Sequence, residues 1–459
     1  MNILILGGGQ VGGTLALELA NERNDVTVVD VDAGRLSQLT KQADIRTVCG
    51  MASHPDVLIN AGIEDADMLV AVTKSDETNI VACQIAHTLF HTPQKISRIR
   101  SASYIDHTVL FDDNHIPIDV IITPETLVTD YITRLLKQPG ALQVLNFAEG
   151  KVKLVAVRAK EGGPLVGEKL EAIRKHVPGV DTRVAAIFRK DKAILPSGNT
   201  VVEDGDEVFF IAARNNIRTI MSELQRLEKP YKRIIIAGGG NIGERLAQTI
   251  EKNYHVKLIE QSPERCRYLA EGLQQCIVMQ GSGSDDDLLA EANIEECDVF
   301  IALTNDDQAN IMASLLAKRR GARKVITLIT NPAYVELVQG ESGIDIAFSP
   351  QQITIGRLLR HVRRGDVSNV HSLRRGAAEA MELVAHGDAT TSKVVGRKIA
   401  DIKSPEGVRI GAIVRDGEVH IVRSDSVVES GDHVILFLVD KNLIGAVEKL
   451  FRVSVGFFR

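Results

Sequence analysis

Two glycine-rich segments are the parts of this chain whose spacing points most directly to chemistry. Each has the pattern G-x-G-x-x-G, ends an apolar run and opens a segment with helical periodicity. The glycines are Gly7, Gly9 and Gly12 in the first segment and Gly238, Gly240 and Gly243 in the second. In this setting the first glycine permits a tight turn, the second lets backbone approach a diphosphate, and the third lets helix and strand pack closely. Free N–H groups at the helix start then face the anion, so the sequence predicts two nucleotide sites.

An acidic residue follows each glycine segment, at the end of the next predicted strand. It is Asp30 in the first copy and Glu260 in the second. A carboxylate there can accept hydrogen bonds from both ribose hydroxyls of an adenosine, and its charge repels a 2′-phosphate. The sequence therefore favours NAD, NADH or an adenine nucleotide over the NADP series. The alternative is a Rossmann fold kept as a scaffold, in one copy more readily than in both.

Polar residues near the ends of other predicted strands are further candidates. Ser53 and Ser284 follow the third strand, where a side chain could lie beside the adenine, and Thr73 and Thr304 end the fourth strand. Ligands of such sheets bind at this carboxyl edge. Asp32 could contact the ribose, but we favour a helix N-cap.

The two sites are expected to be unequal. Arg98 and Arg100 are predicted on the fifth strand of the first copy, where an arginine could pair with a phosphate, whereas residues 327–329 of the second copy carry no charge. Asp76 and Asp307 fit helix caps and ligand contacts equally well. The expected binding residues are Gly7, Gly9, Gln10, Val11, Gly12, Asp30, Ser53, Thr73 and Arg98 in the first site, and Gly238, Gly240, Asn241, Ile242, Gly243, Glu260, Ser284 and Thr304 in the second.

These residues belong to a long internal repeat. Gly50 falls on Gly281 and Thr73 on Thr304 at the same spacing of 231 positions that relates the glycine segments. In each copy, short continuous apolar runs alternate with segments of helical periodicity, which predicts a parallel sheet covered on both faces. In the first copy the strands are expected at 2–6, 26–30, 45–49, 67–72, 96–100 and 118–122.

A second, fainter repeat follows each sheet. Residues 201–206 (VVEDGD) match 427–432 (VVESGD), and both lead into a strongly apolar strand. We expect α/β architecture throughout, with two doubly wound Rossmann domains, each followed by a small α/β domain. The expected domains are 1–139 and 229–365, each with a crossover helix (124–137 and 350–363), and the small domains 140–228 and 366–459.

Composition narrows the class of protein. The chain has 459 residues, 44% of them hydrophobic and 25% charged, and a net charge of -6 that disfavours a nucleic-acid partner. Its five cysteines form no metal-binding pattern and suit a reducing cytosol. Neither a signal peptide nor a membrane span is predicted.

No catalytic set accompanies the nucleotide segments. The sequence has no Tyr-x-x-x-Lys pair and no G-x-x-x-x-G-K-[ST] loop, and its 12 histidines are dispersed. A dehydrogenase needs a proton-transfer group beside the nicotinamide. We therefore expect a binding protein, with no catalytic and no metal-ligating residues, and keep an NAD-dependent oxidoreductase as the alternative.

The motifs resemble the TrkA family, which belongs to the RCK/KTN regulators of potassium channels and transporters, over essentially the full chain. The resemblance is carried by NILILGGGQVGGTLA with VVDVD, by ADMLVAVTKSDETNIVACQIA, and by the repeats RIIIAGGGNIGERLA and ECDVFIALTNDDQANIMASLLAK. Many family members have an acid directly after the Gly50-type glycine, whereas Met51 and Ser282 stand there in this chain. This departure leaves the preferred nucleotide open, most of all in the second half.

The resemblance implies a role that the residues alone do not give. It implies tandem TrkA-N and TrkA-C domains in a cytoplasmic subunit that lies peripherally on the inner face of the plasma membrane. The subunit would form a homo-oligomer, a tetrameric ring, beneath a potassium translocator of the TrkH or TrkG type. Binding of NAD(H), or of ATP against ADP, would change the shape of the ring and gate ion flow.

Overall fold

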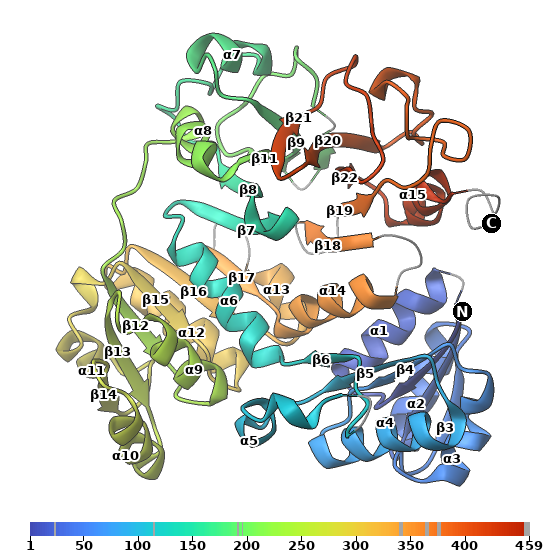
Figure 1. Cartoon of the computed structure of the whole chain (residues 1–459). Coiled ribbons are helices and arrows are strands. Elements are labelled where there is room, and N and C mark those ends of the chain that lie inside the picture. The colour runs from blue at the N-terminus through green and yellow to red at the C-terminus, as the bar shows by residue number, and fades with distance from the viewer. Residues whose placement is uncertain are drawn as a thin grey trace. The chain divides into compact units, whose positions relative to one another are not determined.

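The computed structural model describes residues 1–22, 24–112, 115–190, 192–194, 196–338, 343–362, 367–373 and 378–453. The chain divides into two compact units (Figure 1). The first contains Met1–Val128 together with Pro350–Val362, and the second contains Thr129–Ser349 together with the chain from Arg363 onward. The domain boundary expected at 365/366 lies outside the described residues.

The first unit is built on a parallel sheet of six strands in the order β3-β2-β1-β4-β5-β6. Its strands are β1 (Asn2–Leu6), β2 (Asp25–Asp30), β3 (Arg46–Cys49), β4 (Met68–Ala71), β5 (Gln94–Arg98) and β6 (Val120–Ile122). The helices between them are α1 (Gln10–Asn21), α2 (Ala33–Gln42), α3 (Pro55–Asn60), α4 (Asp76–Phe90) and α5 (Ala102–Ile105). The strand order reverses between β1 and β4, and ligands bind at such a switch point in open α/β sheets.

Both faces of this sheet are covered, as the continuous apolar strands predict. One face buries residues such as Leu4 and Leu69 against α4, where Ala82 and Cys83 lie. The other face is covered by α1, α2 and α14 (Pro350–Val362), a helix that the sequence places more than two hundred residues later. The crossover helix of the second half therefore completes the core of the first sheet.

The second unit contains the matching parallel sheet, in the order β14-β13-β12-β15-β16-β17. Its strands are β12 (Arg233–Ala237), β13 (His255–Glu260), β14 (Ile277–Gln280), β15 (Val299–Ala302), β16 (Lys324–Leu328) and β17 (Ile346–Phe348). Its helices are α9 (Asn241–Ile250), α10 (Pro263–Gly272), α11 (Asp286–Glu291), α12 (Asp307–Arg319) and α13 (Pro332–Leu337). Most of the first crossover helix, α6 (Pro124–Leu136), belongs to this unit, where the ring of Tyr131 lies 5.5 Å from that of Phe348.

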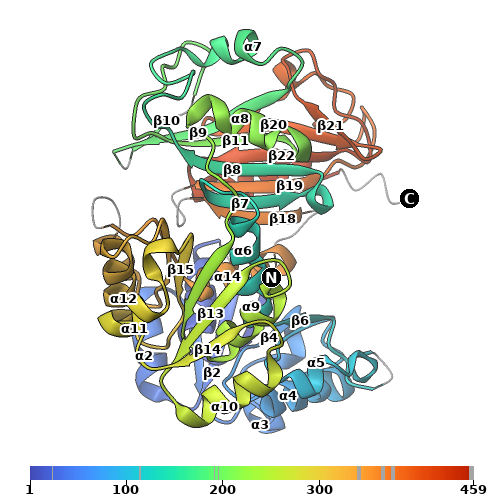
Figure 2. The same cartoon turned by 90° about the vertical axis from the view of Figure 1, so that its left-hand side faces the viewer.

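Two antiparallel five-stranded sheets form the small domains of the second unit. The first contains β7 (Ala141–Phe147), β8 (Val152–Arg158), β9 (Thr182–Arg189), β10 (Lys192–Ile194) and β11 (Glu207–Ala213), with helices α7 (Ile173–His176) and α8 (Ile217–Leu224). The second contains β18 (Val367–Leu373), β19 (Ala378–Val384), β20 (Val408–Arg415), β21 (Glu418–Ile421) and β22 (His433–Leu438), with helix α15 (Ile444–Phe451). The two sheets share one apolar core, in which Phe147 and Phe209 meet Ala380 and Phe437 (Figure 2).

The repeated motif before the last strand of each small domain contains a buried aspartate that pairs with an arginine. Asp206 is almost fully buried and accepts two hydrogen bonds of 2.8 Å from Arg189, and Asp432 accepts the same pair from Arg415. A buried carboxylate needs such bidentate pairing to offset its lost hydration. The expected fold class, paired Rossmann and small domains, is confirmed. Among the described residues no helix has the length and apolar character needed to cross a membrane.

Candidate nucleotide-binding sites

The first glycine loop connects β1 to α1 by a turn that requires its glycines. Gly7 has a φ of +104°, and a Cβ on Gly12 would lie 1.9 Å from the carbonyl oxygen of Gly7. A Cβ on Gly9, by contrast, would meet no atom within 4 Å, so the open side of the loop is at Gly9. Helix α1 begins at Gln10 and has no acidic residue in its first turn. The loop thus presents helix N–H groups to an open face, which is the arrangement that binds phosphate groups.

The acid at the end of β2 is held against this loop. One carboxylate oxygen of Asp30 accepts the Gly8 N–H at 2.6 Å, and the other accepts the Asp32 N–H at 2.8 Å. Glu260 makes the same pair of bonds in the second copy, with Gly239 at 2.8 Å and Ser262 at 2.9 Å. Each carboxylate is therefore oriented by backbone and retains lone pairs for a ribose.

The turn after β2 fits the predicted roles only in part. Asp32 caps α2 by accepting the N–H groups of Gly34 and Arg35, so the preferred interpretation as an N-cap is confirmed. Val31 and Met51 are exposed apolar side chains beside Asp30 and Gly50; sequence reasoning did not single out Val31, because the exposure of an apolar residue cannot be read from the sequence.

Serines occupy the turn after the third strand of each copy. Ser53 is half-buried in the turn that leads into α3. In the second copy the Ser284 hydroxyl lies 2.9 Å from that of Ser282, so the two serines interact with each other.

The hydroxyl groups of Thr73 and Thr304 make hydrogen bonds within the protein. The Thr73 hydroxyl donates to the side-chain oxygen of Asn79 at 2.7 Å, and the Asn79 amide donates to the Arg98 carbonyl at 2.9 Å. Thr304 and Asn310 repeat the first of these bonds at the same distance. A fully buried asparagine thus ties the carboxyl ends of the fourth and fifth strands together, a role that sequence reasoning missed although both asparagines were part of the repeat.

The helix-cap interpretation of Asp76 and Asp307 was wrong, and a ligand contact by either residue stays a prediction. The N-caps of α4 and α12 are the preceding residues, Ser75 and Asp306. Asp76 instead accepts the N–H groups of Arg100 and Ser101, at 2.9 and 2.8 Å. Asp307 does the same for residues 330 and 331 in the second copy. These acids fix the loop after the fifth strand, which explains why they occur in both copies.

The predicted arginine pair separates in the structure. Strand β5 ends at Arg98, so the prediction that Arg100 also lies on it was wrong; Arg100 bonds to the Lys74 carbonyl from the following loop. Burial, and then the charge of Arg100, lower the pKa of Arg98. Its Nε atom is buried without a hydrogen bond in the part of the chain that the structure describes. Leu328 occupies the equivalent end of β16, so only the first site has this cation.

The second glycine loop has the backbone of the first but different surroundings. Gly238 has a φ of +110°, a Cβ on Gly243 would lie 1.9 Å from the Gly238 carbonyl oxygen, and Gly240 is open. In the first turn of α9, however, Glu244 pairs with Arg265 at 2.5 Å, and Arg265 also donates to the Gly239 carbonyl at 2.8 Å.

The first copy lacks this ion pair. Gly13 stands where the second copy has Glu244, and Arg35, the counterpart of Arg265, pairs with Asp32 at 3.3 Å instead. The difference places a carboxylate in the first helical turn after the second glycine loop and none after the first.

Comparison with protein families agrees with the doubled architecture. The TrkA-N domain family matches residues 3–124 and 234–350, and the TrkA-C domain family matches residues 154–225 and 388–452. Among solved structures, the RCK domain of GsuK covers 98% of this chain and 94% of its own at 17% identity, with a TM-score of 0.60. A GsuK channel bound to NAD also has a TM-score of 0.60, covering 98% of this chain and 78% of its own at 17% identity. These structural likenesses establish the RCK-like fold.

Relatives that match over the full length identify the family more narrowly. The Trk system potassium uptake protein TrkA of Halomonas elongata is 61% identical over 100% of both chains, and that of Vibrio alginolyticus is 59% identical over the same share. The protein of the same name in Haemophilus influenzae is 52% identical, also over 100% of both chains. The names of these relatives and the TrkA-N family match describe a protein of potassium uptake, in agreement with the expectation of a regulatory protein that is not an enzyme. The chain belongs to the TrkA family of Trk potassium uptake proteins, with TrkA-N and TrkA-C domains in tandem.

Proposed function

We propose that the chain is a nucleotide-sensing regulatory subunit that gates a membrane potassium translocator of the TrkH or TrkG type. The single observation that carries this proposal is the anchored acid at each glycine loop, held by one loop N–H and by one N–H two residues further on. This arrangement leaves an open helix N-terminus for a diphosphate and an oriented carboxylate for a ribose. NAD or NADH is the proposed ligand, with ATP and ADP as alternatives.

The proposed contacts follow from the same geometry. The N–H groups of the loops and of the first helical residues, Gln10, Val11, Asn241 and Ile242, would face the phosphates, while Asp30 and Glu260 would hold a ribose. In the first site, Arg98 supplies a cation and exposed Val31 and Met51 supply apolar surface for a base. Ser53 and Ser284 remain candidates at the edge of the base. Thr73 and Thr304 would contribute indirectly, by positioning the backbone at the end of the fourth strand of each copy.

The contact between α1 and α14 supports a route from ligand binding to movement in the first unit. The Gln351 amide of α14 donates to the side-chain oxygen of Gln10 at 2.5 Å, and α14 packs along α1. Gln10 is the first residue of the phosphate-facing helix. A ligand that shifts this helix start would therefore act on the crossover helix directly. Such a ligand shifts a two-state element only by its difference in affinity for the two states.

Assembly completes the proposal. A homo-oligomer, such as a tetrameric ring, on the cytoplasmic side of the membrane would let the movements of several subunits act together on one translocator. The alternative function, an NAD-dependent oxidoreductase, would require a proton-transfer group at the nicotinamide position.

Reconstitution with a translocator tests this proposal. We expect potassium flux through vesicles containing the translocator to respond to the protein plus NADH, ATP or ADP. The Gln351→Ala variant should bind nucleotide as the unaltered protein does but transmit less of the effect. Oxidation of NADH by the purified protein with a carbonyl substrate would refute the proposal. Potassium flux that does not change with any of the nucleotides would refute it as well.

A further inference from the structure

A cluster of basic side chains lies where the first crossover helix meets the first small sheet. Arg134 and Lys137 come from the C-terminal end of α6 and the residue after it, Lys153 from β8, and Arg214 from the residue after β11. The Arg214 N–H donates to the Lys151 carbonyl at 3.0 Å, which fixes Arg214 next to the start of β8. We call these four residues the basic cluster.

The charges in the basic cluster act on one another. Burial lowers the pKa of Lys153 first, and the charges of Arg214, Lys137 and Arg134 lower it further; among the described residues, each charge that acts on it is positive. The pKa of Arg134 is also lowered by burial, and the charges of Asp130 and Tyr131 oppose this shift. Such cations cost free energy unless an anion compensates them.

Hydrogen bonding in the basic cluster is incomplete. The Nε atom of Arg134 is buried and makes no hydrogen bond within the described residues. Buried polar atoms are normally paired, so an unpaired guanidinium atom among like charges indicates a missing partner.

The second small sheet shows that the fold does not require cations at these positions. The strand registers of the two small sheets are identical, with β8 equivalent to β19 and β11 equivalent to β22. Glu379 stands where the first sheet has Lys153, and Asp440 stands where it has Arg214. The second half thus has two acids at the positions where the first half has two bases.

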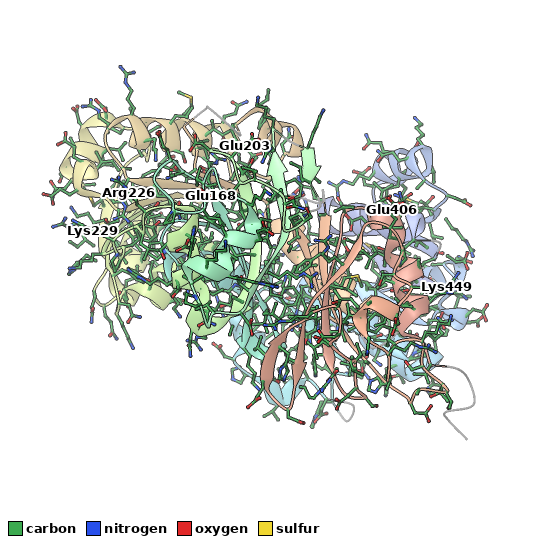
Figure 3. The ribbon with its side chains drawn as sticks, turned by 90° about the horizontal axis from the view of Figure 1, so that it is seen from above. Glu168, Glu203, Arg226, Lys229, Glu406 and Lys449 are labelled. Atoms are coloured by element: carbon green, nitrogen blue, oxygen red, sulfur yellow. The ribbon has the colours of Figure 1, made fainter. Side chains whose placement is uncertain are left out.

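An ordinary solvated surface in the same domain has a different character. The exposed side of the first small domain carries Glu168 and Glu203 as well as Arg226 (Figure 3). Mixed charges of this kind neutralise one another in water. The four side chains of the basic cluster have one sign only, and Arg134 and Lys153 are partly removed from solvent.

We propose that the basic cluster is a binding site for a compact oxyanion, a phosphate or the phosphoryl group of a larger molecule. Two guanidinium groups and two ammonium groups from three elements suit the several oxygens of one phosphoryl group. Partial burial of Arg134 and Lys153 favours a compact group over a flat polyanionic surface such as nucleic acid. Because the site joins α6 to the small domain, its ligand would fix the crossover helix to that domain.

The variant Lys153→Glu/Arg214→Asp tests the proposal by giving the first sheet the residues of the second. Its control is Lys192→Glu/Arg226→Asp, which makes the same change of net charge at exposed positions of the same domain. Titration calorimetry with inorganic pyrophosphate at constant ionic strength should show at least ~10-fold weaker binding, or one site fewer, in the cluster variant than in the control. The cluster variant should also be the more thermally stable of the two without phosphate, because it removes repulsion.

Two further experiments cover the case in which the double variant does not fold and identify the source of the anion. If the double variant does not fold, Lys153→Met removes one charge without adding an acid, and it should weaken pyrophosphate binding in the same direction. Cosedimentation with phosphatidylglycerol vesicles identifies the source: binding that needs the basic cluster supports a lipid headgroup in this site, and its absence beside pyrophosphate binding supports a free ligand. Equal pyrophosphate binding by the cluster variant and its control would overturn the proposal. Because the glycine loops are unchanged in both variants, nucleotide binding stays an independent test.

Discussion

The two glycine loops differ in what surrounds them and not in how they are built. Both have a glycine at positive φ, a third glycine pressed against the carbonyl of the first, and an acid bonded to a loop N–H. Only the second loop has the Glu244–Arg265 ion pair, and only the first has Arg98 at the end of the fifth strand. The two copies share the residues that shape the turn and differ in the charges around it.

A second difference lies at the opposite end of the fifth strand. Lys324 opens β16 where Gln94 opens β5. Lys324 is buried, and its ammonium donates to the Ala141 carbonyl of the first small domain at 2.7 Å. Burial lowers its pKa to about 8, with partial compensation from Glu228 and Asp345.

Replacing Lys324 with Gln, the residue of the first sheet, is expected to have the largest effect. A lysine with a folded pKa of about 8 and an unfolded value of 10.5 makes the protein more stable as pH rises between those values. The shift corresponds to roughly 3 kcal/mol, which Lys324→Gln should remove from the pH dependence of stability. Urea unfolding from neutral to about pH 10 measures it. Parallel pH profiles for the variant and the unaltered protein would show that Lys324 is not buried as a cation.

Gly12→Ala should distort the first loop, because its Cβ would lie 1.9 Å from the Gly7 carbonyl oxygen. We expect a loss of about 1–3 kcal/mol in stability and no nucleotide binding at that site. Gly9→Ala is the matched control, since its Cβ meets no protein atom. It should keep the melting temperature and lose affinity, because the methyl group enters the space reserved for phosphate. Thermal unfolding and calorimetry together separate the two outcomes; equal melting temperatures would contradict the clash.

Glu244→Gly gives the second loop the residue at position 13 of the first. The carboxylate near the phosphate position disappears and Arg265 becomes free to pair with the ligand, so affinity at the second site should rise ~10-fold. Adding Arg265→Ala should abolish that gain. An unchanged affinity in the single variant would mean that the ion pair does not face the ligand.

The sequence predicted the turns better than the long-range pairs. Glycine spacing and an acid one strand later identify β1, α1 and β2 because local geometry demands those residue types. The pairing of Arg265 with Glu244 could not be predicted, since neither residue is unusual in its own helix. Nor could the position of α14 on the first sheet, because an amphipathic pattern shows that a helix covers something but not which sheet. Arg100 was placed on β5 because the apolar run continues past the point at which the strand pairing ends.

Titration calorimetry with NADH, NAD, ATP and ADP on the unaltered protein, Asp30→Ala and Glu260→Ala tests the central claim most directly. Each variant removes the oriented carboxylate of one loop. We predict binding without turnover at two unequal sites in the unaltered protein. In each variant, binding at one of these sites should be lost or weakened at least ~10-fold. An absence of binding in the unaltered protein, or identical isotherms for all three proteins, would show that the glycine loops are scaffold and that nucleotide sensing is not the function of this chain.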